Sequence, residues 1–407
     1  MDIFLRSFCP SPQHIGVTMN RYPTFILFFL LLAGVSSSFA QYLTSAKLYM
    51  RQREWTMAEA SALKAVAKDP DDEEAWFVLG QIRYELRKYP EMIEAFDKAA
   101  SIDPKEHQKE IHSYRLKLWA DSYNAGIKYY NLGRDSAKYF AIAIDSFKTA
   151  VMAQPDSAMT YYVCALAMYA NGQRDDAVAM LNKGIEKKPN FPDALSLLGR
   201  LHMQRARMKL EDKDSLGAKK EYDAAVAAFE KLYQYNPSDP ANVMSLLEVY
   251  EKAGMDDKAL NLTKTCAESD PKNRLCRYAY GLYLIKKEQF EQGIKQLDTM
   301  LAIAPEEKDE LYKDALYNLG VAYQNWGVAL KAISDKKVEE SKGKVKEDMT
   351  YKEKFKAALA AFQKVEEHKK DDATLYQALG KLYATLNMPK EAKAAFETAD
   401  RLIKEGK

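Results

Sequence analysis

Residues 76–104 read WFVLGQIRYELRKYPEMIEAFDKAASIDP, and this stretch decides the fold of the chain. Its first part places the large residue Trp76 four positions before the small residue Gly80. Its second part carries the large residue Phe96 among other apolar residues at helical spacing. Pro104 follows, and a proline ends a helix because it has no backbone N–H to donate. We therefore predict two antiparallel helices, in which small residues let the backbones approach closely and large residues fill the space between them.

The same pattern recurs along most of the chain, with a proline at the end of each unit. These prolines are Pro70, Pro104, Pro155, Pro189, Pro237, Pro271 and Pro305. Four of the six intervals between them are 34 residues, and the other two are 51 and 48 residues. Two units therefore carry insertions, which we place near 105–118 and 203–222.

A later unit departs further from this period. It begins with Leu316, Leu319 and Gly320, but Phe362, the aromatic residue of its second helix, arrives 26 residues late. Apolar residues continue at helical spacing beyond Gly320. We therefore predict that this unit contains an extended helical hairpin near 326–355.

The recurring pattern, W-x2-L-G … A-x3-F-x2-A … P, resembles the signature of the tetratricopeptide-repeat family. About nine such units cover the chain, the first seven over residues 41–312 and the last two over 313–407. The resemblance implies an all-α fold, a right-handed α-solenoid in which each helix pair contacts only its neighbours. It also implies a concave face, lined by the first helix of each pair, that binds peptides or partner domains.

Residues 1–40 lie outside this pattern and are typical of a signal peptide. Arg21 precedes a short apolar run, Phe25–Ala33, and small residues then lead to Ala40. We expect cleavage after Ala40, and we hypothesise that translation begins at Met19. A membrane anchor is the alternative, although the apolar run is about half of the roughly 20 residues that a spanning helix needs. Together with the repeats, the signal resembles that of an exported protein of a Gram-negative bacterium, periplasmic or secreted and not inserted in the membrane after cleavage.

Aromatic residues occupy many of the first-helix positions that face the groove in the repeat family. They are Phe77, Tyr84, Tyr123, Tyr130, Tyr162, Tyr169, Tyr278 and Tyr317. We predict that they bind a partner, because tyrosine offers a large contact area at low entropic cost. The partner would be an extended peptide or an amphipathic helix. Alternatively, these tyrosines pack against the neighbouring repeat, or the segment 105–116 lies over them.

Several other kinds of chemistry are not indicated by the sequence. A formal net charge of +2 with interspersed signs argues against a nucleic-acid surface. No His-x3-His or Cys-x2-Cys pair is present, and neither is a phosphate-binding glycine loop. We find no nucleophile and base in a catalytic arrangement, so we predict no enzymatic activity, no cofactor and no metal. Cys266 and Cys276 would form a disulfide if their Cα atoms lay within about 7 Å.

The sequence therefore favours a non-enzymatic scaffold of the bacterial cell envelope that binds another protein, itself an envelope protein. The aromatic groove or the extended hairpin would carry this interaction. One alternative is a structural protein that self-associates or tethers envelope layers, with the hairpin as its dimerisation device. Another is a non-catalytic subunit of an enzyme complex.

Overall fold

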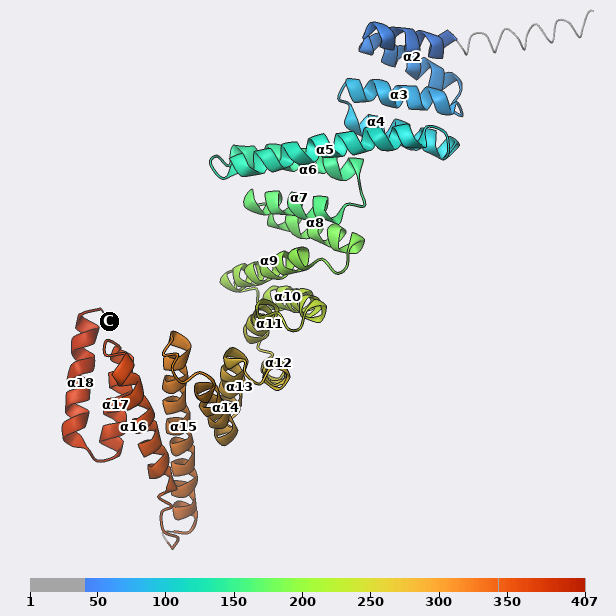
Figure 1. Ribbon diagram of the computed structural model, residues 1–407. Coiled ribbons are helices and arrows are strands. Elements are labelled where there is room, and N and C mark those ends of the chain that lie inside the picture. Colours follow the sequence, from blue (N-terminus) through green and yellow to red (C-terminus); the bar gives the residue numbers. More distant parts are fainter. Residues whose placement is uncertain (1–40, 343, 407) are drawn as a thin grey trace, which may run out of the picture. The chain divides into compact units, whose positions relative to one another are not determined.

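The computed structural model describes residues 41–342 and 344–406, and within these ranges every regular element is a helix (Figure 1). The prediction of an all-helical repeat fold is therefore confirmed for this part of the chain. The predicted signal peptide and its cleavage site lie outside the described residues. Contacts between Cα atoms divide the chain into two units between Lys188 and Pro189, inside the stretch that the sequence analysis treated as seven continuous repeats.

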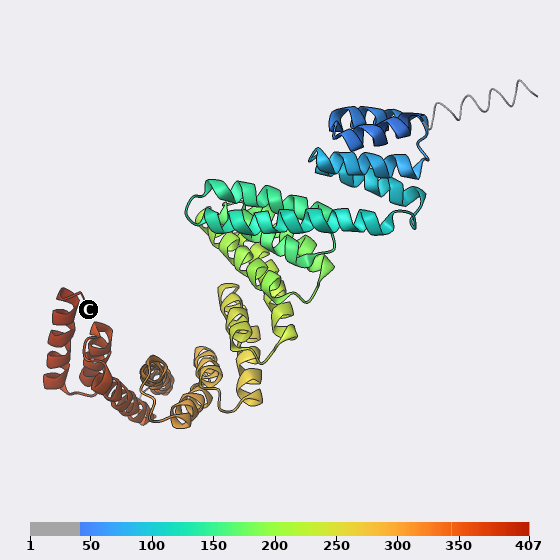
Figure 2. The same cartoon turned by 45° about the horizontal axis from the view of Figure 1, so that its top comes forward.

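The first unit contains four helix pairs. Its helices are residues 41–52, α2 (Trp55–Lys68), α3 (Glu73–Glu85), α4 (Tyr89–Ile102), α5 (Gln108–Gly133), α6 (Lys138–Ala153), α7 (Ala158–Ala170) and α8 (Arg174–Lys187). In the later repeats of the unit α3 packs on α4, α5 on α6 and α7 on α8. Most of the segment 105–118 belongs to α5, which is one unbroken helix of 26 residues (teal in Figure 2).

The second unit contains five helix pairs. Its helices are α9 (Pro192–Glu211), α10 (Ser215–Tyr235), α11 (Pro240–Lys252), α12 (Asp256–Ser269), α13 (Arg274–Lys286), α14 (Phe290–Ile303), α15 (Glu310–Glu340), α16 (Thr350–His368), α17 (Ala373–Thr385) and α18 (Pro389–Lys404). The stretch 203–222 lengthens both α9 and α10, which have 20 and 21 residues. The late arrival of Phe362 reflects the length of α15, which has 31 residues.

One contact between a glycine and a phenylalanine holds most of the helix pairs together. In five repeats a phenylalanine of the second helix lies directly over a glycine of the first. The pairs are Gly80 with Phe96, Gly126 with Phe147, Gly199 with Phe229, Gly320 with Phe362 and Gly380 with Phe396. A Cβ atom added to Gly80 would lie 2.4 Å from the ring of Phe96, so the two helices can approach this closely only where the first residue is glycine.

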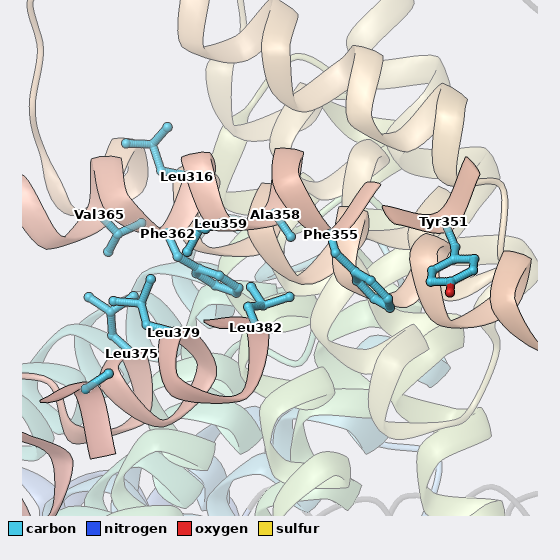
Figure 3. Close-up of a cluster of buried hydrophobic side chains, with 11 residues drawn as sticks. Leu316, Tyr351, Phe355, Ala358, Leu359, Phe362, Val365, Leu375, Leu379 and Leu382 are labelled. Atoms are coloured by element: carbon cyan, nitrogen blue, oxygen red, sulfur yellow. The ribbon is translucent and has the colours of Figure 1, made fainter. Parts of the chain in front are cut away.

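The extended hairpin repeats this contact at intervals of seven residues. Beyond Gly320 and its partner, Gly327 lies under Phe355. Seven residues further, the buried Ser334 takes the small position and its Oγ accepts a hydrogen bond of 2.8 Å from the Asp348 N–H. Seven residues are about two helical turns, so the same faces of α15 and α16 stay opposed. Figure 3 shows the phenylalanines along α16 beside the leucines of α17.

A disulfide joins two consecutive repeats in the second unit. Cys266 near the end of α12 is bonded to Cys276 in the first turn of α13, and their Cα atoms are 5.7 Å apart. The distance meets the condition set from the sequence. The bond ties the end of one helix pair to the start of the next.

Candidate partner-binding surface

The first helix of the second repeat does not present its aromatic residues to solvent as the sequence led us to expect. Phe77 is only 5% exposed, and its ring stacks on the imidazole of His107 with 3.9 Å between the ring centres. Nδ1 of His107 lies 3.0 Å from the carboxylate of Glu73, which holds the imidazole over the ring. Burial raises the pKa of Glu73, while its hydrogen bond with His107 acts in the opposite direction. Phe77 is therefore a packing residue with almost no surface for a partner.

Tyr84 is also engaged within the unit. Its ring meets Tyr114 edge-on with 5.1 Å between ring centres, and the ammonium group of Lys117 lies 5.4 Å above it. Tyr114 also packs on Phe96 at 5.6 Å and accepts a long hydrogen bond of 3.5 Å from Gln81 Nε2. Both Tyr114 and Lys117 belong to the early turns of α5. The alternative in which this segment lies over the tyrosines therefore describes the second repeat.

Apolar residues that keep part of their surface exposed lie on α5 and α7, and we call this set the α5–α7 face. Its members follow one another at intervals of three or four residues along each helix, and none of them is charged. They are Tyr123, Ile127 and Tyr130 from α5 and Met159, Tyr162, Leu166 and Tyr169 from α7. Met159 is 45% exposed and Tyr169 is 40% exposed, while the other five are half-buried. The sequence analysis selected the four tyrosines but not the aliphatic residues between them.

The rings on α5 are held in place by the helix behind them. Tyr123 meets Phe147 edge-on at 5.9 Å, and Phe147 is fixed over Gly126. Tyr130 contacts Phe140 with 5.7 Å between the ring centres and the two rings tilted. Tyr123 and Tyr130 thus pack on the second helix of their own repeat and keep part of their surface exposed, and their binding of a partner stays a prediction. A surface with little freedom to lose binds with a smaller entropic penalty.

A hydrogen bond joins the two helices of this face at one end. Trp119 on α5 donates from Nε1 to the Oγ1 atom of Thr160 on α7 over 3.0 Å. Thr160 is fully buried, and its own hydroxyl donates to the capping Ser157. Trp119 also packs beside Tyr123 with 5.4 Å between ring centres. A specific polar contact therefore links α5 to α7 at this end.

The two aromatic residues predicted in the second unit are engaged in contacts within that unit, and Tyr278 joins two of its repeats. The hydroxyl oxygen of Tyr278 on α13 accepts a hydrogen bond of 2.9 Å from Asn318 Nδ2 on α15. Tyr317 meets Phe362 edge-on at 5.3 Å. Burial raises the pKa of both phenols. Tyr278 therefore contacts the first helix of the next repeat, α15, and Tyr317 packs on the second helix of its own repeat, α16.

The described residues contain no arrangement that points to metal chemistry or to membrane insertion. Within ranges 41–342 and 344–406, no group of three or more His, Cys, Asp and Glu side chains is placed to hold a metal ion. No helix in the same ranges has both the length and the apolar character needed to cross a membrane. The contacts of the α5–α7 face are suited to binding through apolar surface.

Four family models match parts of the chain. Models described as tetratricopeptide repeat match residues 43–107 and 373–405, and a model described as Tetratricopeptide Repeats-Sensor matches 139–247. A model for subunit 3 of the anaphase-promoting complex (cyclosome) matches residues 218–300. Together these matches reach both units of the chain.

Two curated proteins and many solved structures are similar at low identity. The chain is 20% identical to anaphase-promoting complex subunit 3 of Schizosaccharomyces pombe over 249 residues, which are 56% of this chain and 35% of that protein. It is 23% identical to the TPR repeat-containing protein YpiA of Bacillus subtilis over 263 residues, 64% of this chain and 51% of YpiA. The chain thus spans about a third to a half of the length of these relatives.

The crystal structure of YrrB, a TPR protein with an unusual peptide-binding site, aligns with a TM-score of 0.38 and 18% identity. This alignment covers 57% of this chain and 96% of YrrB. The repeated glycine–phenylalanine contacts, the paired helices and the family models all lead to the same assignment. The chain belongs to the tetratricopeptide-repeat family, and its fold is an α-solenoid of helix pairs.

Proposed function

We propose that this protein is a non-enzymatic scaffold that binds a partner protein through the α5–α7 face. Repeats of this family generally serve as non-catalytic interaction modules. The observation that carries the proposal is the absence of charge across seven adjacent positions that keep surface exposed, with Met159 at 45% and Tyr169 at 40%. A contiguous apolar patch rimmed by polar residues marks an interaction site more often than an idle surface.

The expected partner is a peptide or an amphipathic helix. The residues of the face run along α7 at intervals of three and four, so they form a stripe parallel to the helix axis. A partner helix with apolar residues at i, i+3 and i+7 would match such a stripe. The tyrosine hydroxyl groups would remain at the rim, where they can bond to the polar side of the partner.

We further propose that the protein is exported and that its partner belongs to the bacterial cell envelope. The support is the sequence of residues 1–40, with Arg21, the apolar run 25–33 and the small residues before Ala40. Mass spectrometry of the protein isolated from its host tests this. A mature N-terminus at Gln41 is the expected result, and a chain that retains the apolar run would contradict it.

Site-specific photo-crosslinking in the host tests the binding face directly. A probe at Tyr169 should capture one distinct partner, while a probe at Leu216, which is 67% exposed on α10, serves as the control for non-specific capture. Capture of a second copy of this chain from position 169 would instead favour a self-associating structural protein.

Substitution of the same face provides the quantitative test against the captured partner. The triple change Tyr130→Ala, Tyr162→Ala and Tyr169→Ala should weaken binding by at least tenfold, because each tyrosine at a binding hot spot contributes roughly 1 kcal/mol or more. Leu216→Ala is the matched control and should leave affinity unchanged. If the triple variant folds and binds as tightly as the natural chain, this face is not the binding site.

A further inference from the structure

The sixth repeat, α11 with α12, lacks the contact that holds most other repeats together. Thr263 stands 34 residues before Leu297 and takes the place at which five repeats carry phenylalanine. Leu247, which stands 34 residues before Gly281, takes the place of the glycine. In this repeat the larger residue, Leu247, is therefore on the first helix and the smaller one, Thr263, is on the second helix, and neither has an aromatic ring. Thr263 is 1% exposed and Leu247 is 8% exposed, so both remain inside the repeat.

A cavity lies beside this pair of residues. Its volume is about 230 Å³, and both Leu247 and Thr263 line it. The rest of its wall combines apolar side chains, among them Val243 from α11 and Ala279 from α13, with polar residues that include Ser238, Asp270 and Asn273. Met244 also lines the cavity and is 39% exposed, so the cavity reaches the surface of the second unit at that side chain.

Three polar side chains around the cavity are hydrogen-bonded within the protein. The hydroxyl of Thr263 donates to the carbonyl of Ala259 in its own helix over 2.9 Å. Oδ1 of Asn273 caps α13 by accepting from the Cys276 N–H over 3.0 Å. The Ser269 hydroxyl donates to a carbonyl one turn earlier in α12. An apolar ligand in the cavity therefore leaves these three side chains with their own hydrogen bonds.

The disulfide keeps the walls of the cavity together. Cys266 on α12 and Cys276 on α13 both line the cavity and are bonded to each other. Each side chain therefore contributes apolar surface, and the bond limits how far α12 and α13 can move apart or close the space. Because the walls are held apart, the cavity stays open in the free protein, and a ligand that fills it gains the full free energy of the new apolar contacts.

We propose that this cavity, which we call the repeat-6 cavity, binds a single apolar aromatic ring. A dry apolar cavity of about 150 Å³ is large enough for benzene, and the repeat-6 cavity has about 230 Å³. The ring takes the place of the phenylalanine that other repeats supply themselves. It comes either from a small aromatic molecule or from the phenylalanine side chain of a partner.

Binding of toluene and of a capped glycine-phenylalanine-glycine peptide to the full chain tests the proposal. Saturation-transfer NMR should show saturable binding of at least one of these probes. Toluene alone would identify a free molecule as the ligand, whereas tighter binding of the peptide would identify a partner side chain. Absence of saturable binding for both probes would overturn the proposal.

Filling the cavity from within should abolish this binding. The variant Leu247→Gly with Thr263→Phe restores the pair found in five repeats, and affinity for the probe should fall at least tenfold. Thr263→Leu fills less of the cavity and introduces the residue type that the next repeat carries at this position, Leu297. This single variant tests the proposal if the double variant does not fold. Thr265→Leu on the exposed side of α12 is the matched control and should bind as the natural chain does. Unchanged affinity in a folded Thr263 variant would place the probe elsewhere and overturn the assignment.

Discussion

Replacement of Gly80 by alanine tests the contact on which the helix pairs depend. The added Cβ atom would lie 2.4 Å from two ring carbons of Phe96, closer than non-bonded carbon atoms approach. Phe96 is 0% exposed, and its ring is packed against Phe77 and Tyr114 as well. The ring therefore has no space into which to move, and α3 and α4 must separate.

The expected loss of stability follows from two opposing effects. Overpacking of a well-filled core costs about 1–3 kcal/mol. Alanine in place of glycine inside a helix stabilises the helix by about 1 kcal/mol, which offsets part of this loss. We expect a net loss of about 1 kcal/mol for Gly80→Ala, which corresponds to about fivefold in the equilibrium between closed and open states of this helix pair.

Phe96→Leu should rescue the alanine variant. The fourth repeat carries Ala165 and Leu181 at the equivalent positions, and both are fully buried there. The loss in the double variant should therefore be smaller than the sum of the two single losses by about 1 kcal/mol, a coupling typical of residues in contact.

Hydrogen exchange of the α3 and α4 amides is the appropriate assay, because repeat proteins open locally and a single global free energy is not well defined for them. Gly281→Ala is the matched control, since its Cβ would lie 3.0 Å or more from its neighbours and should disturb its repeat less. Additive losses in the Gly80 and Phe96 variants would refute the argument that this contact sets the helix spacing.

Three further variants or treatments have defined outcomes. Burial raises the pKa of Cys164 to about 12, so iodoacetamide at pH 8 should modify this thiol only after unfolding, as peptide mass spectrometry would show. The Arg274 guanidinium holds the pKa of Asp309 in the folded protein below its usual value. This ion pair therefore stabilises the fold at any pH above about 3.9, the pKa of an unfolded aspartate, and the stabilisation is lost as the pH falls through the lower pKa of the folded state. Arg274→Gln should therefore lower stability near neutral pH and flatten the loss on acidification, followed by circular dichroism; an unchanged acid profile would contradict it. Phe355→Ala removes the ring over Gly327 at a cost of about 3–5 kcal/mol, so exchange should accelerate in α15 beyond Gly327 and stay unchanged in α18.

The helix pairs could be predicted from the sequence because the decisive contact is local and periodic. Gly80 and Phe96 are 16 residues apart, and the same pair recurs with the same separation at Gly380 and Phe396. A pattern of this kind predicts both the elements and the face that each one buries. The division of the chain between Lys188 and Pro189 was not accessible in this way, because it depends on how closely consecutive repeats approach.

The candidate site was accessible only in part. Counting positions in the repeat identifies which residues lie on the first helix, and it found the tyrosines of the α5–α7 face. It does not identify which of them another element covers. His107 and Tyr114 belong to the insertion, and their contacts with Phe77 and Tyr84 are tertiary contacts that the period does not encode. The same count places Ile127 and Leu166 on the groove side, but only the aromatic residues were predicted to bind.

The contacts between the two helices of the longer hairpins follow a rule that the sequence does contain. Gly126 and Gly133 lie under Phe147 and Phe140, so a step of seven forward on one helix is matched by a step of seven backward on the other. The fifth repeat exceeds the period by 14 residues, which is one step of seven on each helix. An insertion of this size keeps the small and large residues opposed, whereas an unequal insertion would rotate one face away from the other. Glycines seven residues apart in a first helix, such as Gly320 and Gly327, therefore indicate a hairpin that continues beyond its neighbours with an intact interface.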